Sequence, residues 1–275
     1  MNAALNAFFV LVLLMLSAAF GMFVKVHLAE RHRSRETIEL VSLVVTMLVT
    51  FAALVMGLLT YSVKGGFDRD NADMAAVAAQ IVQLDQSLRN YGPAALGARI
   101  ALRRYTESVL ASTWPNHPPP RLETHPVRAV PVSPGGMESR ALGVVLNGVG
   151  LTIRHLAAED VLHQGLAARA LANFHTLEAA RWTLIEDARP TVSVPFYLVL
   201  VFWLIVIYVL FGLNAPSNVF VFIIITLSAI SIASAMFVIL DLDTPFTGYV
   251  VVSSRPMRDA LIDIIRPEPA VVPAP

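Results

Sequence analysis

The sequence predicts an all-α integral membrane protein with four transmembrane helices, arranged as two hairpins that are joined by a helical extramembrane domain. Hydrophobic residues make up 56% of the chain and charged residues only 15%, whereas soluble domains carry about 25% charged residues. Two further observations support this fold class. The chain has four long apolar stretches, and apolar residues between the stretches recur at helical spacing. In lipid every backbone polar group must be paired within its own element, so the spans are expected to be helices.

Each apolar stretch is long enough to cross a bilayer, which takes about 20 apolar residues in a helix. The stretches are Leu5–Val24, Ile38–Val63, Val192–Leu213 and Val219–Leu240. No basic residue precedes the first stretch, as a signal peptide would require, so it is expected to remain as an anchor. The predicted division is 1–63 as the first hairpin, 64–191 as the extramembrane domain, 192–240 as the second hairpin and 241–275 as a turn with an amphipathic tail.

The loop between the first two spans is basic, with Lys25, Arg31, Arg33 and Arg35. Short loops rich in Lys and Arg prefer the cytoplasmic side. This pattern predicts a multi-pass protein of a bacterial inner membrane, with residues 64–191 and the tail outside.

The extramembrane domain is expected to consist of helical arms. Met74, Val77, Ile81, Leu84, Leu88 and Tyr91 follow a heptad spacing, which predicts that the second span continues out of the membrane as a rod. Gly92 should end this helix. The next helix, 94–112, is expected to turn Leu96, Ile100, Val109 and Leu110 inward and Arg99, Arg103, Arg104 and Glu107 outward. Prolines exclude a helix from the connection at 114–136, and helical patterning resumes over 138–189.

The second span carries small, weakly polar residues at spacings of four, three and four: Thr46, Thr50, Ala53 and Gly57. Two interpretations are open. The favoured one is close helix packing, in which small residues let backbones approach and threonines bond to the neighbouring helix. The other is a pore lining in an oligomer. Ser228, Ser231 and Ser234 in the fourth span favour packing more strongly, because serines can bond to their own helix.

Several classes of function are excluded or disfavoured. The chain has no cysteine, and its 20 basic and 20 acidic residues cancel, so thiolate sites and a nucleic-acid partner are not expected. No nucleotide-binding, hydrolase or metalloprotease motif is present, so we expect neither an enzyme nor a cofactor. His155, Glu159 and His163 share a predicted helix face, yet a solvated face is favoured over a metal site there, because zinc needs convergent ligands.

Several stretches resemble the bacterial bestrophin-like family: "GFDRDNADMAAVAAQIVQLDQSLRNYGPAA", "RRYTESVLASTWP", "ARWTLIEDARPTVSVPFYLVLVFWLIVIYVLFGLNAPSN" and "LDLDTPFTGYVVVSSRPMRDAL". The resemblance implies an oligomeric anion channel whose second membrane helix lines the pore, with Phe51, Leu54 and Leu58 as candidates beside the threonine stripe. It also implies a cytosolic location for the turn after the fourth span, opposite to the prediction from charge.

The turn after the fourth span reads Asp241, Asp243, Pro245, Phe246, Thr247 and Gly248. Bestrophins have a Pro-Phe-Gly turn followed by acidic residues; here Thr247 is inserted and "YVVVSS" replaces the acids, so their calcium site does not carry over. From physical chemistry alone, the two carboxylates are expected to fix the depth of the fourth span in the membrane. Pro245 should end the helix, and Gly248 should permit the chain to reverse direction. "RPMRDALIDII" then predicts an amphipathic helix with Met257, Leu261 and Ile264 on one face.

Two functional hypotheses follow. The first is a homo-oligomeric bestrophin-like ion channel, with anions as the expected ions. The alternative is a non-conducting membrane assembly or accessory protein, whose helical arms bind another membrane or envelope component.

Overall fold

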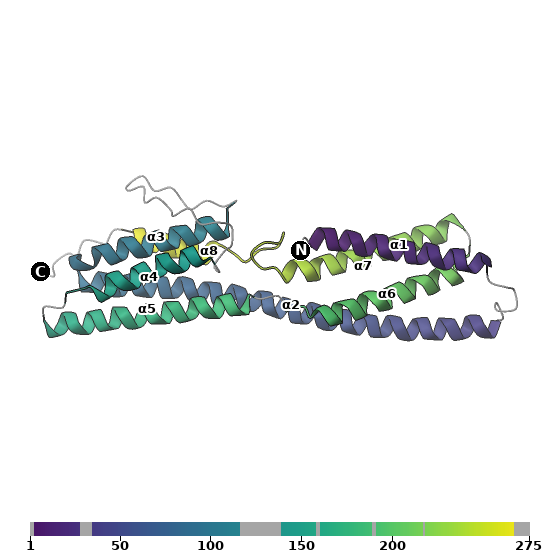
Figure 1. Cartoon of the computed structure of the whole chain (residues 1–275), viewed down its shortest axis with the longest axis horizontal. Coiled ribbons are helices and arrows are strands. Elements are labelled where there is room, and N and C mark those ends of the chain that lie inside the picture. The colour runs from purple at the N-terminus through teal and green to yellow at the C-terminus, as the bar shows by residue number, and fades with distance from the viewer. Residues whose placement is uncertain are drawn as a thin grey trace, which may run out of the picture. The chain divides into compact units, whose positions relative to one another are not determined.

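The computed structural model describes residues 3–27, 35–115, 139–157, 160–188, 191–216 and 218–266, with side chains from residue 39 onward in the second range. Its elements are α1 (Ala3–His27), α2 (Arg35–Tyr91), η2 (Pro93–Ala95), α3 (Leu96–Thr113), α4 (Arg140–Arg154), α5 (Val161–Asp187), α6 (Val194–Asn214), α7 (Val219–Leu242) and α8 (Arg255–Ile265) (Figure 1). These ranges contain helices and turns but no strand, which confirms the all-α prediction.

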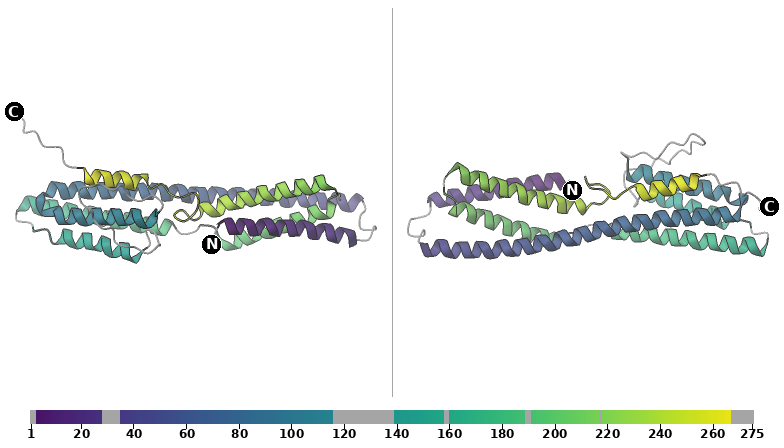
Figure 2. Two further views of the ribbon diagram at one scale, coloured as in Figure 1. Left: turned by 90° about the horizontal axis from the view of Figure 1, so that it is seen from above. Right: turned by 180° about the vertical axis from the view of Figure 1, so that it is seen from behind.

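The chain forms two compact units. The first, which we call the membrane unit, comprises Met1–Phe67 and Pro190–Val251; the second, the helical unit, comprises Asp68–Arg189 and Val252–Pro275. Helix α2 contributes to both units (Figure 2). Four helices in the described ranges are long and apolar enough to cross a membrane: α1, Glu39–Tyr91 of α2, α6 and α7. The predicted spans are therefore confirmed as helices.

Two glycines set the closest approach in the membrane unit. A Cβ atom on Gly21 would overlap the carbonyl oxygen of Val209, and a Cβ atom on Gly212 would overlap the carbonyl oxygen of Ala18. Only glycine lets the backbones of α1 and α6 come this close. The Lys25 ammonium donates to the Ala215 carbonyl oxygen at 2.6 Å, so the two helices run in the same direction and are tied at their ends.

Helix α6 also contacts the other two spans. The Tyr208 hydroxyl and the Ser228 hydroxyl of α7 are 2.9 Å apart, and the rings of Trp203 and Phe51 of α2 are 6.3 Å apart between centroids. A buried apolar cluster surrounds these contacts, with Leu14, Leu204 and Met236 among its members. Helix α6 therefore contacts each of the other three spans.

In the helical unit, the predicted heptad seam is confirmed. Met74, Val77, Ile81, Leu84, Leu88 and Tyr91 are at most 3% exposed. Helix α2 ends at Gly92, whose φ of 98° lies in the left-handed region that favours glycine. The chain then returns along α3. Helix α5 packs back along the same stretch of α2, where the Asn173 amide donates to the Ser87 hydroxyl at 2.6 Å.

Ion pairs and hydrogen bonds of arginine join α2, α3 and α8 in the helical unit. Asp85 is almost fully buried and accepts from Arg89 at 2.6 Å and from Arg99 at 2.9 Å. The Arg89 guanidinium also donates to the carbonyl oxygens of Asp263 and Ile264 at 3.0 and 2.9 Å. Arginine thus satisfies carbonyls that the C-terminus of α8 leaves open. Met257, Leu261 and Ile264 are buried, as the amphipathic pattern of this helix predicts.

Some predictions about the arms were wrong. Leu96 and Ile100 were expected inside, but they are 56% and 47% exposed. Glu107 was expected outside; it is buried and binds Arg103 at 2.8 Å. The helical patterning over 138–189, by contrast, corresponds to helices α4 and α5. Residues 28–34 of the basic loop and 116–136 of the proline-rich connection lie outside the described residues.

Candidate functional site: the outer face of α2 and the turn after α7

The membrane-spanning half of α2 is the least covered of the four spans. In α1, α6 and α7 the most apolar window is 28–33% buried, whereas in α2 it is 11% buried. Three other helices lie in the same unit, yet most of the α2 surface is left for lipid or for another chain. This imbalance makes α2 the first candidate for a functional surface.

One narrow face attaches α2 to the unit. Val45, Ala52 and Val63 are buried on it. Leu48, Val55, Met56 and Leu59 are partly buried against the core. The spacings of three, four and seven residues place these side chains on one side of a helix.

The stripe predicted from sequence lies away from this attached face. Thr46, Thr50, Ala53 and Gly57 are all exposed, and at 3.6 residues per turn they align along a single line of the helix. Leu54 and Leu58, also exposed, each follow a stripe residue by one position, about 100° further around the axis. Phe51 lies closer to α6, as its contact with Trp203 shows. The outer face therefore combines a small, weakly polar stripe with a bulky apolar one.

The threonines of the stripe bond to their own helix. The Thr46 hydroxyl donates to the Ser42 carbonyl oxygen and the Thr50 hydroxyl to the Thr46 carbonyl oxygen, both at 2.8 Å. A Cβ atom on Gly57 would meet nothing within 4 Å. Within the described part of one chain, no neighbouring helix packs against this stripe, so bonding across a helix seam does not occur there. Ser231 and Ser234 of α7 bond to their own helix in the same way.

The turn after α7 is built around Asp241. This side chain is 1% exposed, and its carboxylate accepts from the amides of Tyr249 at 2.9 Å and Val250 at 2.8 Å. A Cβ atom on Gly248 would lie 2.7 Å from Asp241 Oδ1. Gly248 is therefore required by close approach to the carboxylate and not by a left-handed φ, which among the described glycines only Gly92 adopts. The sequence anticipated the turn but not this reason for it.

Asp243 performs the same task for a different segment. Its Oδ1 accepts from the amides of Thr191 and Val192 at 2.7 and 3.1 Å. These residues lead into α6, so Asp243 fastens the start of one span to the end of another. In the turn that follows Asp243, Pro245 is buried and Phe246 is partly buried. Both carboxylates bind backbone N–H groups, which is the strong, charge-assisted kind of hydrogen bond.

The histidine cluster considered as a weak metal site does not share one helix. His155 is the C-cap of α4, whereas His163 lies in α5, and Glu159 lies outside the described residues. His163 instead pairs with Asp160 at 2.7 Å, and the backbone hydrogen bond from His163 lowers the pKa of Asp160. Among the described residues no group of at least three His, Cys, Asp or Glu side chains could hold a metal ion.

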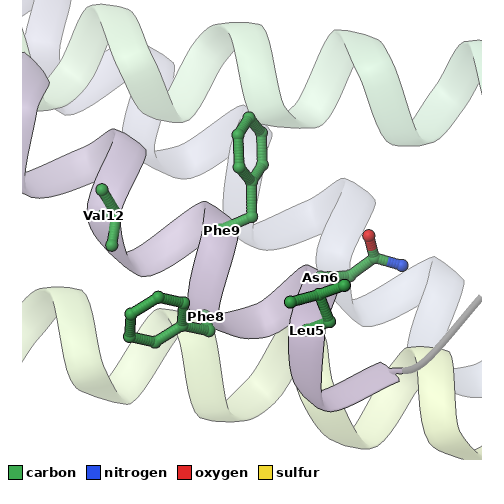
Figure 3. Close-up of a pocket in the computed structure, with 5 residues that line it drawn as sticks. All are labelled: Leu5, Asn6, Phe8, Phe9 and Val12. Atoms are coloured by element: carbon green, nitrogen blue, oxygen red, sulfur yellow. The ribbon is translucent and has the colours of Figure 1, made fainter.

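A shallow hollow lies on α1 between Leu5, Asn6, Phe8, Phe9 and Val12. The side chains fan out from the helix and do not converge on a common point (Figure 3). Leu5, Phe8 and Phe9 are each more than 60% exposed, as expected of a membrane helix whose surface faces acyl chains. Apart from Asn6 the lining is apolar, so the hollow offers little to orient a polar ligand.

Comparison with known proteins decides the family. The Bestrophin-like domain matches residues 12–257, which include α2 and the turn after α7. The chain belongs to the bestrophin-like family. No curated protein matches the sequence.

Solved structures of bestrophin homologues share the fold. Two point mutants of a bacterial bestrophin homolog from Klebsiella pneumoniae each give a TM-score of 0.61. One has 16% identity over 94% of this chain and 97% of that chain, and the other has 17% identity over 95% and 100%. A structure described as a membrane protein gives 0.60 at 16% identity, over 94% and 97%.

Some functional positions escaped sequence analysis. Gly21, Gly212 and Lys25 hold α1 against α6, yet their partners are about 190 positions away. The only local signal is a small residue within an apolar span, which many spans contain. The backbone partners of Asp241 and Asp243 were also missed, because they depend on how the loops fold back onto these carboxylates.

Proposed function

We propose that this bestrophin-like protein is a homo-oligomeric ion channel of a bacterial inner membrane, with α2 along the pore and anions as the ions that pass. The observation that carries the proposal is the outer face of α2. Thr46, Thr50, Ala53 and Gly57 form a continuous stripe that the chain leaves uncovered. A ring of chains would bring copies of this face together around a common axis.

Exposed apolar residues of the helical unit support the oligomer. Leu96, Ile100 and Val144 are 56%, 47% and 66% exposed. Lipid can cover such residues on the spans, but it is not expected to cover them on helices outside the spans. Apolar surface of this kind marks protein contacts, and a second copy of the chain would cover it.

The chemistry of the stripe suits weak, multi-site passage of ions. Its threonine hydroxyl groups already donate to their own helix, so their oxygens remain as acceptors and their methyl groups face outward. No charged residue lies between Glu39 and Lys64. Ions would therefore cross this stretch without binding a fixed charge, while Leu54 and Leu58 could narrow the path by excluding water.

Halide flux into liposomes tests the proposal. Purified protein shown to be a folded oligomer should admit halide above the level of empty vesicles. Replacing Thr50 by Leu should reduce this flux, because a bulky side chain enters the stripe. Thr226→Leu is the matched control: Thr226 lies on α7 and also bonds to its own helix, at 2.8 Å. No flux from a folded oligomer, or equal loss in both variants, would contradict the channel.

The second candidate is a non-conducting assembly or accessory protein that binds another envelope component. Val161 and Leu162, at the start of α5, are 84% and 68% exposed, and a partner could cover them. A folded oligomer that is silent in the flux assay would favour this candidate. We propose neither catalysis nor a bound cofactor for either candidate.

The side of the membrane that holds the helical unit distinguishes the two orientation predictions. A reporter that is active only in the periplasm can be fused to the C-terminus. Activity would support the orientation predicted from the basic loop, and inactivity with normal expression would support the cytosolic placement that the family resemblance implies.

A further inference from the structure

Three carboxyl groups meet where α5 ends against α2. Asp70 and Asp73 lie on successive turns of α2, and Asp187 is the last residue of α5. Burial, the charge of Asp187 and hydrogen bonding with the Asp187 side chain raise the pKa of Asp73. Two carboxyl groups can share a hydrogen bond only when one of them carries a proton.

Asp70 lies deepest in this cluster. It is 3% exposed, and its Oδ1 atom, like Oδ2 of Asp73, is buried without a hydrogen-bond partner among the described residues. An ionised carboxylate without partners is costly in such a place. Burial raises the pKa of Asp70 to about 6, and the charges of Asp73 and Asp187 add to the rise.

Few groups around Asp70 stabilise its ionised form. Among the described residues, the charged groups that act on Asp70 are Asp73, Asp187 and Arg69, and only Arg69 opposes the rise. Next to Asp70, the Asn71 side chain accepts from the Ser253 amide at 3.2 Å. The Trp114 indole donates to the Val252 carbonyl oxygen at 2.8 Å. Neither of these neighbouring contacts involves a titratable side chain. Asp187 is exposed, so protons can reach the cluster from solvent.

We propose that Asp70, Asp73 and Asp187 form a proton-operated latch that holds the last turns of α5 against α2 when Asp70 is protonated and loosens them when Asp70 is ionised. The pKa of Asp70 is raised in the folded state, from 3.8 to about 6. Its contribution to stability is therefore fully present below about pH 4 and is lost as the pH rises through 6. The latch does not depend on whether the protein conducts ions.

Hydrogen–deuterium exchange of the full chain in lipid nanodiscs tests this device. After correction for intrinsic exchange, the opening constant of residues 181–188 should rise by up to about tenfold per pH unit between pH 4.5 and 6, the slope for one proton. It should level off above about pH 7, beyond the raised pKa. Asp70→Asn, which mimics the protonated form, should keep these amides protected across the range. Asp259→Asn, at an exposed aspartate of α8, should behave like the wild type.

An unchanged pH dependence in Asp70→Asn, or flat exchange in the wild type, would overturn the latch. So would an Asp70→Asn variant that fails to fold at acidic pH, where the protonated wild type is folded. Asp73→Asn gives a second test: it should reduce the pH dependence, because it removes one of the charges that raise the pKa of Asp70.

Discussion

The membrane unit contains two helix surfaces that are both rich in small residues. One is packed against a neighbouring helix, and the other is exposed. On α1 and α6, Gly21 and Gly212 are pressed against the partner backbone. On α2, Thr46, Thr50 and Gly57 are exposed, and a Cβ atom on Gly57 would meet nothing within 4 Å. The first surface is completed within one chain. The second is left for lipid or for another chain.

This difference shows that a stripe of small residues does not by itself identify a packing seam. The α1–α6 contact is supported by Lys25 at its end and by a buried apolar cluster. The α2 stripe has neither, and its hydroxyl groups are satisfied within their own helix. Position within the unit, rather than composition, decides which surface stabilises the fold and which remains available for function.

The largest effect is expected from a substitution that disrupts the contact between α1 and α6. Gly212→Leu should abolish recovery of folded protein, because even the first side-chain carbon would overlap the Ala18 carbonyl oxygen of α1. Gly57→Leu is the matched control and should leave folding intact, since its Cβ position is open. Size-exclusion chromatography in detergent measures both. Normal recovery of Gly212→Leu would show that the two helices do not meet as described.

A smaller loss of stability is expected at the turn that joins the spans. Asp241→Ala leaves the amides of Tyr249 and Val250 without an acceptor. Because hydrogen bonds to a charged group contribute about 1.5–3 kcal/mol, the melting temperature should fall clearly. Asp259→Ala, at an exposed aspartate, should leave it nearly unchanged. Equal effects of the two changes would contradict the role of Asp241.

Asp243→Asn addresses the neighbouring carboxylate. It keeps one acceptor oxygen for Thr191 and Val192 but removes the charge, so it should destabilise the fold less than Asp241→Ala. Ion preference in the flux assay should stay the same. A changed preference with intact assembly would place Asp243 in the ion path instead.

The helical unit allows a change that separates assembly from folding. Ile100→Glu places a charge on a side chain that is 47% exposed in the single chain. It should leave the helix content unchanged but shift the protein to smaller species in light scattering. Ala76→Glu, at another exposed position, should not. An unchanged oligomer in Ile100→Glu would remove this surface from the interface.

The smallest effect on stability is expected on the stripe itself. Thr46→Val should change the unfolding free energy by no more than about 0.5 kcal/mol, as for other exposed positions, because its hydroxyl bonds only to Ser42 of its own helix. Thermal melting compared with the wild type measures this. A large loss would mean that the stripe is a packing seam after all.

The spans and the heptad seam were predictable because their signals are local. Apolar length identifies a span, and the spacing from Met74 to Tyr91 identifies a buried face. Leu96 and Ile100 were misplaced because apolar character shows that a residue avoids water but not which chain covers it. Glu107 was misplaced because a charged residue is buried when Arg103 pairs with it, and sequence alone does not show that pairing.

The site was predictable only in outline. The stripe on α2 and the turn after α7 were both identified from sequence. The reason for Gly248 was not, because it depends on how the chain folds back onto Asp241. The acidic cluster of the helical unit was missed entirely, since Asp187 lies more than a hundred positions from Asp70 and meets it only through the packing of α5 along α2.

Disulfide cross-linking along α2 tests the central claim most directly. The chain has no cysteine, so single cysteines at positions 44–58 can be oxidised in native membranes without background. We predict cross-linked dimers at Thr46, Thr50, Ala53 and Gly57 and none at Val45 or Ala52, which are buried within one chain. Absence of cross-links along the stripe, in a protein shown to be oligomeric, would contradict the meeting of copies at α2.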